Sequence, residues 1–283
     1  MLKISNIKKS YGDFMLNCSM EVKPGYVTGL VGPNGAGKTT VFKAVLDLIR
    51  PDGGKTEVFG KGVKELRERD KQRFGVVLSD SGFSDYLSIH DITCILKNMY
   101  ERYDEDAFLA GCKKFGLPTD KRLMDFSTGM KAKLKLLVAL SHQAELLILD
   151  EPTVGLDVMA RDEMLGLLRS YMEEDENRSI LISSHISSDL EGLCDDLYVI
   201  REGSIVFHEE TDTLLDSYAL LKLSREQFDS LDKEYVLKYK KETYGYYCLT
   251  DQKQFYMENY PEIVIEKGNI DDLIVLMIGG TDL

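Results

Sequence analysis

The sequence is poor in the residues and segments that mark secreted or membrane-spanning proteins. Its 283 residues include no Trp and only 5 scattered Cys with no CxxC pair, so neither a disulfide framework nor a cysteine-rich zinc site is expected. Wholly apolar stretches, such as Leu146–Leu149 and Leu273–Ile278, fall far short of the ~18–20 residues that cross a bilayer. Met1 is not followed by a basic and then apolar signal segment. We therefore expect a cytoplasmic chain in a reducing compartment.

Basic charge is also in short supply. The 35 Lys and Arg residues face 48 Asp and Glu residues, so the formal net charge is −13 and the pI is about 4.9. Nucleic-acid binding needs a positive field over the phosphates, and we expect no nucleic-acid partner. With 43% hydrophobic and 29% charged residues, the chain can bury the core of one large α/β domain plus a small companion.

Strands alternate with amphipathic helices along residues 1–210. This order predicts class α/β, with a largely parallel sheet covered by helices. We expect strands at Leu2–Ile4, Phe14–Val22, Tyr26–Val31, Thr56–Phe59, Phe74–Leu78, Leu146–Asp150, Ser179–Ser183, Leu197–Arg201 and Ile205–Phe207. The helices expected there are Thr39–Leu48, Val63–Lys71, a helical stretch Ser88–Phe115, Gly129–His142, Val158–Glu173 and Ser188–Cys194.

Residues 211–283 differ in composition from the rest of the chain. They are rich in Tyr and contain no motif typical of phosphate binding. We expect a small C-terminal accessory α/β domain in this region. Its expected strands are Ala219–Leu223 and Tyr246–Leu249, and its expected helices are Arg225–Leu231 and Ile270–Ile278.

A glycine-rich turn between a predicted strand and a predicted helix carries the clearest chemical signal. Gly32–Thr40 reads G-P-N-G-A-G-K-T-T, which matches the phosphate-binding pattern G-x-x-x-x-G-K-[ST]. Glycines let such a loop aim its N–H groups inward, and the helix start adds its positive dipole end. Lys38 would place its charge over the β- and γ-phosphates of ATP, and Thr39 would offer its hydroxyl to Mg²⁺. The expected ATP-binding residues here are Asn34, Gly35, Ala36, Gly37, Lys38, Thr39 and Thr40.

The predicted strand Leu146–Asp150 ends in two adjacent acids, Asp150 and Glu151. Alternation along a strand sends their side chains to different faces, which suits two roles. Asp150 can hold the hydration shell of Mg²⁺, while Glu151 can act as general base toward an attacking water. Taken alone, the pair would fit a strand end with solvated carboxylates equally well.

Phe126-Ser127-Thr128-Gly129-Met130 lies between these two motifs, directly before a predicted helix. In this order the three motifs resemble those of ATP-binding-cassette (ABC) ATPases, over about residues 1–210. The resemblance implies a P-loop NTPase fold of ABC type. That fold has a parallel-sheet core, an N-terminal antiparallel β part and a helical subdomain at about residues 88–130. It also implies that Ser127 and Gly129 bind the γ-phosphate of ATP held by the opposite subunit.

The same resemblance assigns roles to three further positions. His185 would contact the γ-phosphate and orient Glu151 and water, so that Glu151, His185 and Lys38 form the catalytic set. Tyr11 would stack on adenine, and Gly155-Leu156-Asp157 would touch the second subunit.

The chain departs from the common family pattern at the end of the predicted strand Phe74–Leu78. Where the family usually has Gln, and sometimes Glu, this chain has Ser79 followed by Asp80. Ser79 is too short to reach the metal, so either Asp80 joins Thr39 and Asp150 as a ligand or water fills the gap. The motif F-S-T-G-M also lacks the usual second Gly and the Gln, and in this form it resembles bacterial exporter ATPases that pair with a separate permease.

The resemblance implies the ATP-hydrolysing subunit of an exporter. Two such subunits, identical or different, would dimerise around two ATP and drive a transmembrane permease from the inner face of the cell membrane. The alternative is a soluble ABC ATPase that acts on the ribosome or DNA, which the single cassette and the acidic charge disfavour. A P-loop kinase or GTPase would leave the F-S-T-G-M motif and His185 unexplained.

Overall fold

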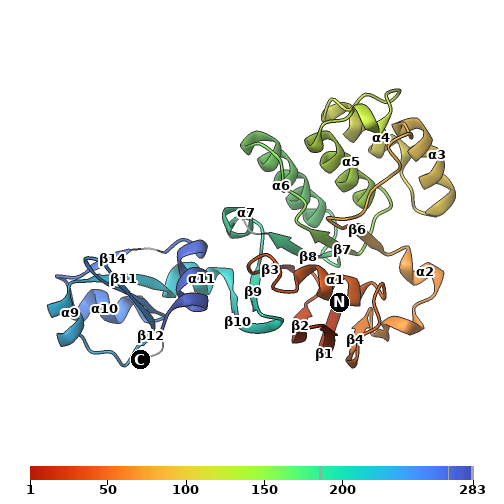
Figure 1. The fold of residues 1–283 in the computed structure, drawn as a ribbon. Helices are drawn as coiled ribbons and strands as arrows, with labels where there is room; N and C mark the ends of the chain where they lie inside the picture. The colour runs from red at the N-terminus through yellow and green to blue at the C-terminus, as the bar shows by residue number, and fades with distance from the viewer. Residues whose placement is uncertain (185–186, 267, 282–283) are drawn as a thin grey trace.

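The computed structural model describes residues 1–184, 187–266 and 268–281. Its centre is a six-stranded sheet with the order β10-β9-β3-β8-β7-β6, and helices cover both faces of this sheet (Figure 1). Strands β9, β3, β8, β7 and β6 pair in parallel, and β10 is antiparallel to β9. The strand bounds are β3 Val27–Val31, β6 Phe74–Val77, β7 Leu146–Asp150, β8 Ser179–Ser184, β9 Asp196–Arg201 and β10 Ser204–Glu210. Because these strands run in parallel, β3, β6, β7 and β8 end at one edge of the sheet.

A second, antiparallel sheet lies below the main sheet in Figure 1. Its order is β2-β1-β4-β5, with β1 Leu2–Tyr11, β2 Phe14–Val22, β4 Gly53–Val58 and β5 Lys61–Gly62. Alternate residues of β2 are buried, as expected for a sheet with one face on the core. Between the two sheets lies helix α1, Lys38–Val45, whose Val41 and Phe42 are fully buried.

Helices on the other face of the main sheet connect it to a helical layer. Helices α5, Thr128–Leu140, and α6, Val158–Glu173, pack on the sheet through a shared apolar cluster. Helices α3, Ile89–Met99, and α4, Glu105–Lys114, pack on α5 and lie at the upper right of Figure 1. Ser88 and Asp104 cap α3 and α4, since each side chain accepts a backbone N–H of the first turn.

The end of the chain forms a third sheet, at the left of Figure 1. Its order is β12-β13-β11-β14 and all its pairs are antiparallel. The elements are α8 Thr211–Ser217, β11 Ala219–Leu223, α9 Arg225–Ser230, β12 Val236–Glu242, β13 Gly245–Thr250, α10 Lys253–Asn259, β14 Val264–Glu266 and α11 Ile270–Gly279. Helix α11 shares a buried cluster with α7, Ser187–Glu191, and the Ile270 N–H donates to Glu191 Oε1 at 2.8 Å. The domain boundary expected after residue 210 stays a prediction.

Most elements expected from the sequence are confirmed, and the bounds of β2, β7, α6 and β11 agree to the residue. Strand β1 is longer than the expected Leu2–Ile4. A register shift between Ile4 and Ile7, with Asn6 at φ 46°, interrupts the alternation of buried and exposed residues along it. The sequence pattern therefore predicted only the first part of the strand.

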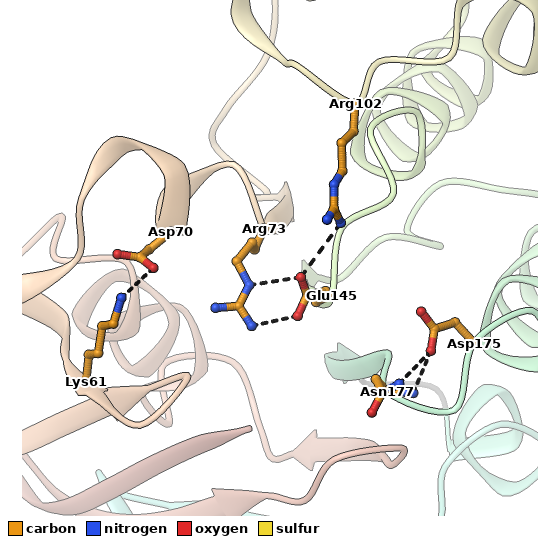
Figure 2. A network of polar contacts seen from close by, with 7 residues as sticks. All are labelled: Lys61, Asp70, Arg73, Arg102, Glu145, Asp175 and Asn177. Atoms are coloured by element: carbon orange, nitrogen blue, oxygen red, sulfur yellow. Dashed lines mark hydrogen bonds and ion pairs between the residues drawn. The ribbon is translucent and has the colours of Figure 1, made fainter.

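The continuous helix expected at Val63–Lys71 is wrong. The segment forms a 3-10 turn, Val63–Glu65, and a short helix α2, Glu68–Lys71. Within it only Asp70 is buried, and its carboxylate accepts from Lys61 Nζ at 2.7 Å (Figure 2). Without an apolar stripe, nothing holds a longer helix on the core.

An ion cluster lies at the end of the main sheet opposite the glycine-rich loop. Arg73 precedes β6, and its guanidinium donates to both carboxylate oxygens of Glu145 at 2.9 and 2.6 Å. Arg102, in the connection from α3 to α4, brings Nη1 to 3.9 Å from Glu145 Oε1 (Figure 2). The cluster therefore connects the helical layer to the start of β6 and β7.

Among the described residues, no helix combines the length and the apolar character that spanning a membrane would require.

Candidate active site

The carboxyl ends of β3, β6 and β7 meet at a cleft of about 680 Å³. Parallel α/β sheets bind ligands at this edge, because the loops that follow the strands converge there. The lining combines the glycine-rich loop, the two acids and one side of α5. The residues are Phe14, Pro33, Asn34, Gly35, Gly37, Lys38, Thr39, Thr40, Val77, Leu78, Ser79, Thr128, Lys131, Ala132, Lys135, Asp150, Glu151, Pro152 and Val154.

The glycine-rich loop has the backbone that its sequence predicts. Gly35 has φ +81° and Gly37 has φ +113°, a region that residues with a Cβ rarely adopt. A Cβ added at Gly37 would lie 3.0 Å from the Phe14 ring, so glycine is also required by close packing. Helix α1 begins at Lys38 and directs its N-terminus at the cleft, where an anion is favoured.

The Lys38 ammonium is held at the base of the cleft. Its Nζ donates to the carbonyl oxygen of Gly32 at 2.7 Å and lies 3.4 Å from Glu151 Oε1. The residue is only 6% exposed. Lys38 and Glu151, 113 positions apart in the sequence, are thus brought together with the ammonium in place for a phosphate.

The Asp150 carboxylate accepts hydrogen bonds from hydroxyl groups on three separate segments of the chain. Its Oδ2 accepts from Thr39 Oγ1 at 2.8 Å and from Ser79 Oγ at 2.9 Å, and its Oδ1 accepts from Ser183 Oγ at 2.7 Å. Asp150 is 1% exposed, and hydrogen bonds to a buried carboxylate are strong because the acceptor is charged.

The oxygen atoms around Asp150 suit Mg²⁺. Mg²⁺ prefers hard oxygen ligands and is commonly held by one or two carboxylates together with substrate phosphates. Thr39 Oγ1 and Asp150 Oδ2 lie 2.8 Å apart and both residues line the cleft. Among the described residues no group of three or more His, Cys, Asp or Glu could hold a metal. With a nucleotide bound, phosphate oxygens would join Thr39 and Asp150 around the metal.

Glu151 leaves the strand in a conformation that separates it from Asp150. Its φ is +53°, which costs a residue with a Cβ about 1 kcal/mol. The Glu151 N–H donates to Ser183 Oγ at 3.0 Å, and this bond helps hold the turn. As a result Asp150 points into the hydroxyl cluster, whereas the Glu151 carboxylate points toward Lys38.

The motif Phe126–Met130 lies at the start of α5. Ser127 caps the helix by accepting the Met130 N–H at 3.2 Å, and it is exposed. A Cβ added at Gly129 would lie 3.2 Å from Leu156 Cδ2, so this motif packs against the loop Gly155–Asp157. Neither Ser127 nor Gly129 lines the cleft of its own chain, and their binding of a second chain's ATP stays a prediction.

Tyr11 and His185 are two further site residues expected from the sequence. Tyr11 is 48% exposed and is absent from the cleft lining, so its stacking on adenine stays a prediction. His185 lies outside the described residues.

Asp80, the expected third metal ligand, pairs with Lys43 of α1 at 2.6 Å. The hydrogen bond from Lys43 holds the pKa of Asp80 below its usual range. The hydroxyl of Ser79, not the carboxylate of Asp80, reaches Asp150. Metal binding by Asp80 stays a prediction.

Sequence reasoning missed Phe14, Ser183, Lys131 and Lys135. Phe14 lines both the cleft and a neighbouring hollow of about 660 Å³ beside Pro33–Ala36, and its position directly after the turn that follows Tyr11 was the available signal. Ser183 lies on β8, beside β7 in the parallel register, where it pairs with Asp150. Lysines on a helix usually form a solvated face, so the sequence carries no signal for Lys131 and Lys135.

Comparison with known proteins agrees with the site. Residues 15–154 match the family model described as ABC transporter. The chain is 37% identical over 216 residues to the lantibiotic transport ATP-binding protein SrtF of Streptococcus pyogenes, covering 75% of this chain and 92% of that protein. It is 36% identical over 210 residues to the bacitracin transport ATP-binding protein BcrA of Bacillus licheniformis, covering 73% and 68%.

A solved structure shares the fold. The ATP-binding cassette MJ0796, a dimer in a post-hydrolysis state with ADP and phosphate, superposes with a TM-score of 0.67. The identity is 19%, over 75% of this chain and 99% of that chain. The α/β cassette fold expected from the sequence is thereby confirmed.

Proposed function

The chain belongs to the ABC transporter family as an ATP-binding, ATP-hydrolysing subunit, and we propose that it drives export through a separate membrane permease. The catalytic part of this proposal is supported by one observation: Lys38, Asp150 and Glu151 lie together at one edge of the sheet. The transport part is supported by relatives whose names describe the transport of lantibiotics and bacitracin. These names describe transport, so the alternative of a soluble ABC ATPase acting on the ribosome or DNA is not favoured.

In the proposed reaction the glycine-rich loop binds the phosphates of ATP. The N–H groups at the start of α1 and the Lys38 ammonium stabilise the negative charge. Thr39 and Asp150 would hold Mg²⁺, which neutralises charge on the β- and γ-phosphates when bound. Glu151 accepts the proton of the attacking water, and its turned backbone places it on the Lys38 side of the cleft.

We infer that hydrolysis requires a second ATPase subunit. Ser127 and Gly129 stand at the start of α5, Ser127 is exposed, and neither residue lines the chain's own cleft. Such a helix start favours an anion, and ATP on a second chain would provide one. ATP then stabilises the closed pair and hydrolysis releases it, which shifts the populations of closed and open states.

The permease would receive this motion on the helical side of the cassette, around α3 and the loop that follows β6. The chain would then lie at the inner face of the membrane, attached through its partner. We propose a peptide, antibiotic or lipid-like molecule as cargo, in line with the names of the relatives. Affinity purification of the chain from membranes should retain a polypeptide with membrane-spanning helices.

Two substitutions test the catalytic proposal. Glu151→Gln removes the base but keeps the shape, so ATP hydrolysis should fall by about 10²-fold or more while ATP still binds. Lys38→Ala removes the buried ammonium, so productive ATP binding should be lost. Steady-state phosphate release and equilibrium ATP binding measure the two effects. Unchanged hydrolysis in Glu151→Gln would remove Glu151 from its role, and wild-type ATP affinity in Lys38→Ala would contradict the phosphate cradle.

A further inference from the structure

One face of α5 forms the wall of the nucleotide cleft opposite the glycine-rich loop. Thr128, Lys131, Ala132 and Lys135 all line the cleft. Their spacing of three and four residues puts them on one side of the helix. Two lysines of α5 therefore line the same cleft as the phosphate-binding loop, in addition to Lys38.

The lysines of α5 differ in their partners. Lys131 Nζ lies 2.6 Å from Asp85 Oδ1, and Lys133 Nζ lies 3.0 Å from Glu163 Oε2. Lys135 has no hydrogen bond or ion pair within the part of the chain that the structure describes. The carboxylate charge that acts on it is that of Asp80, whose own hydrogen bond goes to Lys43.

The Lys135 ammonium is also partly withdrawn from water. The residue is half-buried, and its Nζ lies 3.8 Å from where a Cβ on Gly82 would be, beside the loop that follows β6. Burial lowers the pKa of Lys135, although the charge of Asp80 opposes this. A partly buried cation without a partner is costly, and an anion that enters the cleft would relieve that cost.

We propose that Lys135 is a further ATP-binding residue, whose ammonium binds the terminal phosphate of ATP held by the glycine-rich loop of the same chain. The inference rests on the proposed function. The α- and β-phosphates would lie over the N–H groups of the loop itself. The terminal phosphate would then extend into the cleft that both Glu151 and Lys135 line. Lys135 thus connects the helical layer to the one phosphate that hydrolysis removes.

The test is a comparison of ATP and ADP affinities in the presence of Mg²⁺, measured by calorimetry in the Glu151→Gln background so that no turnover occurs. Lys135→Met keeps the length of the side chain without its charge. Because a hydrogen bond to a charged group contributes substantially, ATP affinity should fall about tenfold while ADP affinity stays within about twofold. Lys135→Arg should restore most of the ATP affinity. The matched control is Lys133→Met, on the same helix but outside the cleft, which should leave both affinities unchanged.

Several results would overturn the inference. Unchanged ATP affinity in Lys135→Met would do so, and so would equal losses for ATP and ADP, because then the ammonium does not distinguish the terminal phosphate. A fall in melting temperature together with equal losses would assign Lys135 a purely structural role. These results leave the proposed function standing. The proposed function would fail separately, and the inference with it, if the Glu151→Gln protein with Lys135 intact did not bind ATP.

Discussion

Among single residues, Asp150 is the point at which distant segments of the chain meet. Its three hydroxyl donors come from the start of α1, from the loop after β6 and from β8. Ser183 has a double role, because its hydroxyl donates to Asp150 and also accepts the N–H of Glu151. It therefore positions both acids.

Ser183→Ala should impair hydrolysis more than binding. The substitution removes the hydroxyl that donates to Asp150 Oδ1 and that holds the strained turn at Glu151. The free energy of unfolding should fall by about 1–3 kcal/mol. Turnover should fall severalfold, with ATP affinity changed less. Chemical denaturation and steady-state kinetics measure these effects.

A control for Ser183→Ala lies on the same strand. Ser179, at the other end of β8, accepts the Gly25 N–H at 3.1 Å and donates to the Lys23 carbonyl at 3.1 Å. Ser179→Ala should also lower stability but leave turnover intact. Equal kinetic effects of the two substitutions would show that Ser183 acts on stability alone.

The sequence predicted these residues unevenly, for a physical reason. The glycine-rich loop is a local structure, whose backbone follows from consecutive glycines and a following helix, and the sequence contains all of that information. The hydroxyl cluster joins Thr39, Ser79, Asp150 and Ser183 across sheet positions, so it depends on strand order, which residue spacing does not reveal. For the same reason residue spacing does not show that Lys135 lines the cleft.

At the scale of the elements, the ends of the main sheet have different chemistry. The carboxyl ends of the strands form the cleft, and the opposite end is joined to the helical layer by Arg73, Glu145 and Arg102 (Figure 2). The side chain of Glu145 is 25% exposed, so its bidentate contact with Arg73 is partly protected from solvent screening.

Glu145→Gln should weaken this junction. The neutral amide keeps the shape but loses the charge that both arginines face, at an expected cost of about 1–2 kcal/mol. The melting temperature should fall by a few degrees, at about 2–4 °C per kcal/mol for a chain of this size. The matched control is Glu101→Gln, because Glu101 lines the same surface pocket as the ion cluster. This control should change the melting temperature little. A melting temperature equal to wild type in Glu145→Gln would show that the ion cluster contributes no net stability.

Element prediction from the sequence succeeded where burial is continuous or strongly periodic. Strand β7 is buried at every position and α6 begins at a capping Asp157, so both were predicted to the residue. The segment Val63–Lys71 and strand β1 were not, since one has no buried stripe and the other contains a bulge. Neither feature leaves a regular pattern in the sequence.

On the scale of the whole molecule, the C-terminal sheet shares buried residues with the main sheet. Leu220, Ile270 and Leu273 share one buried cluster with Leu197 of the main sheet. Arg201 on β9 donates to the carbonyl oxygen of Ile278 on α11. The composition change at residue 211 predicts a small accessory domain, which stays a prediction. It does not reveal the shared buried cluster, because these contacts join segments far apart in the chain.

The claim that two chains close around ATP is tested most directly by the molar mass of Glu151→Gln in solution, measured by light scattering during size-exclusion chromatography. With ATP and Mg²⁺ the mass should rise to twice the 32.1 kDa of one chain, and without nucleotide it should return to the single-chain value. Adding Ser127→Arg to the same protein should keep it at the single-chain mass with ATP still bound. Two results together would contradict the account. The Glu151→Gln protein would bind ATP in the glycine-rich loop yet stay at 32.1 kDa at every concentration. The wild type would hydrolyse ATP at full rate as a single chain.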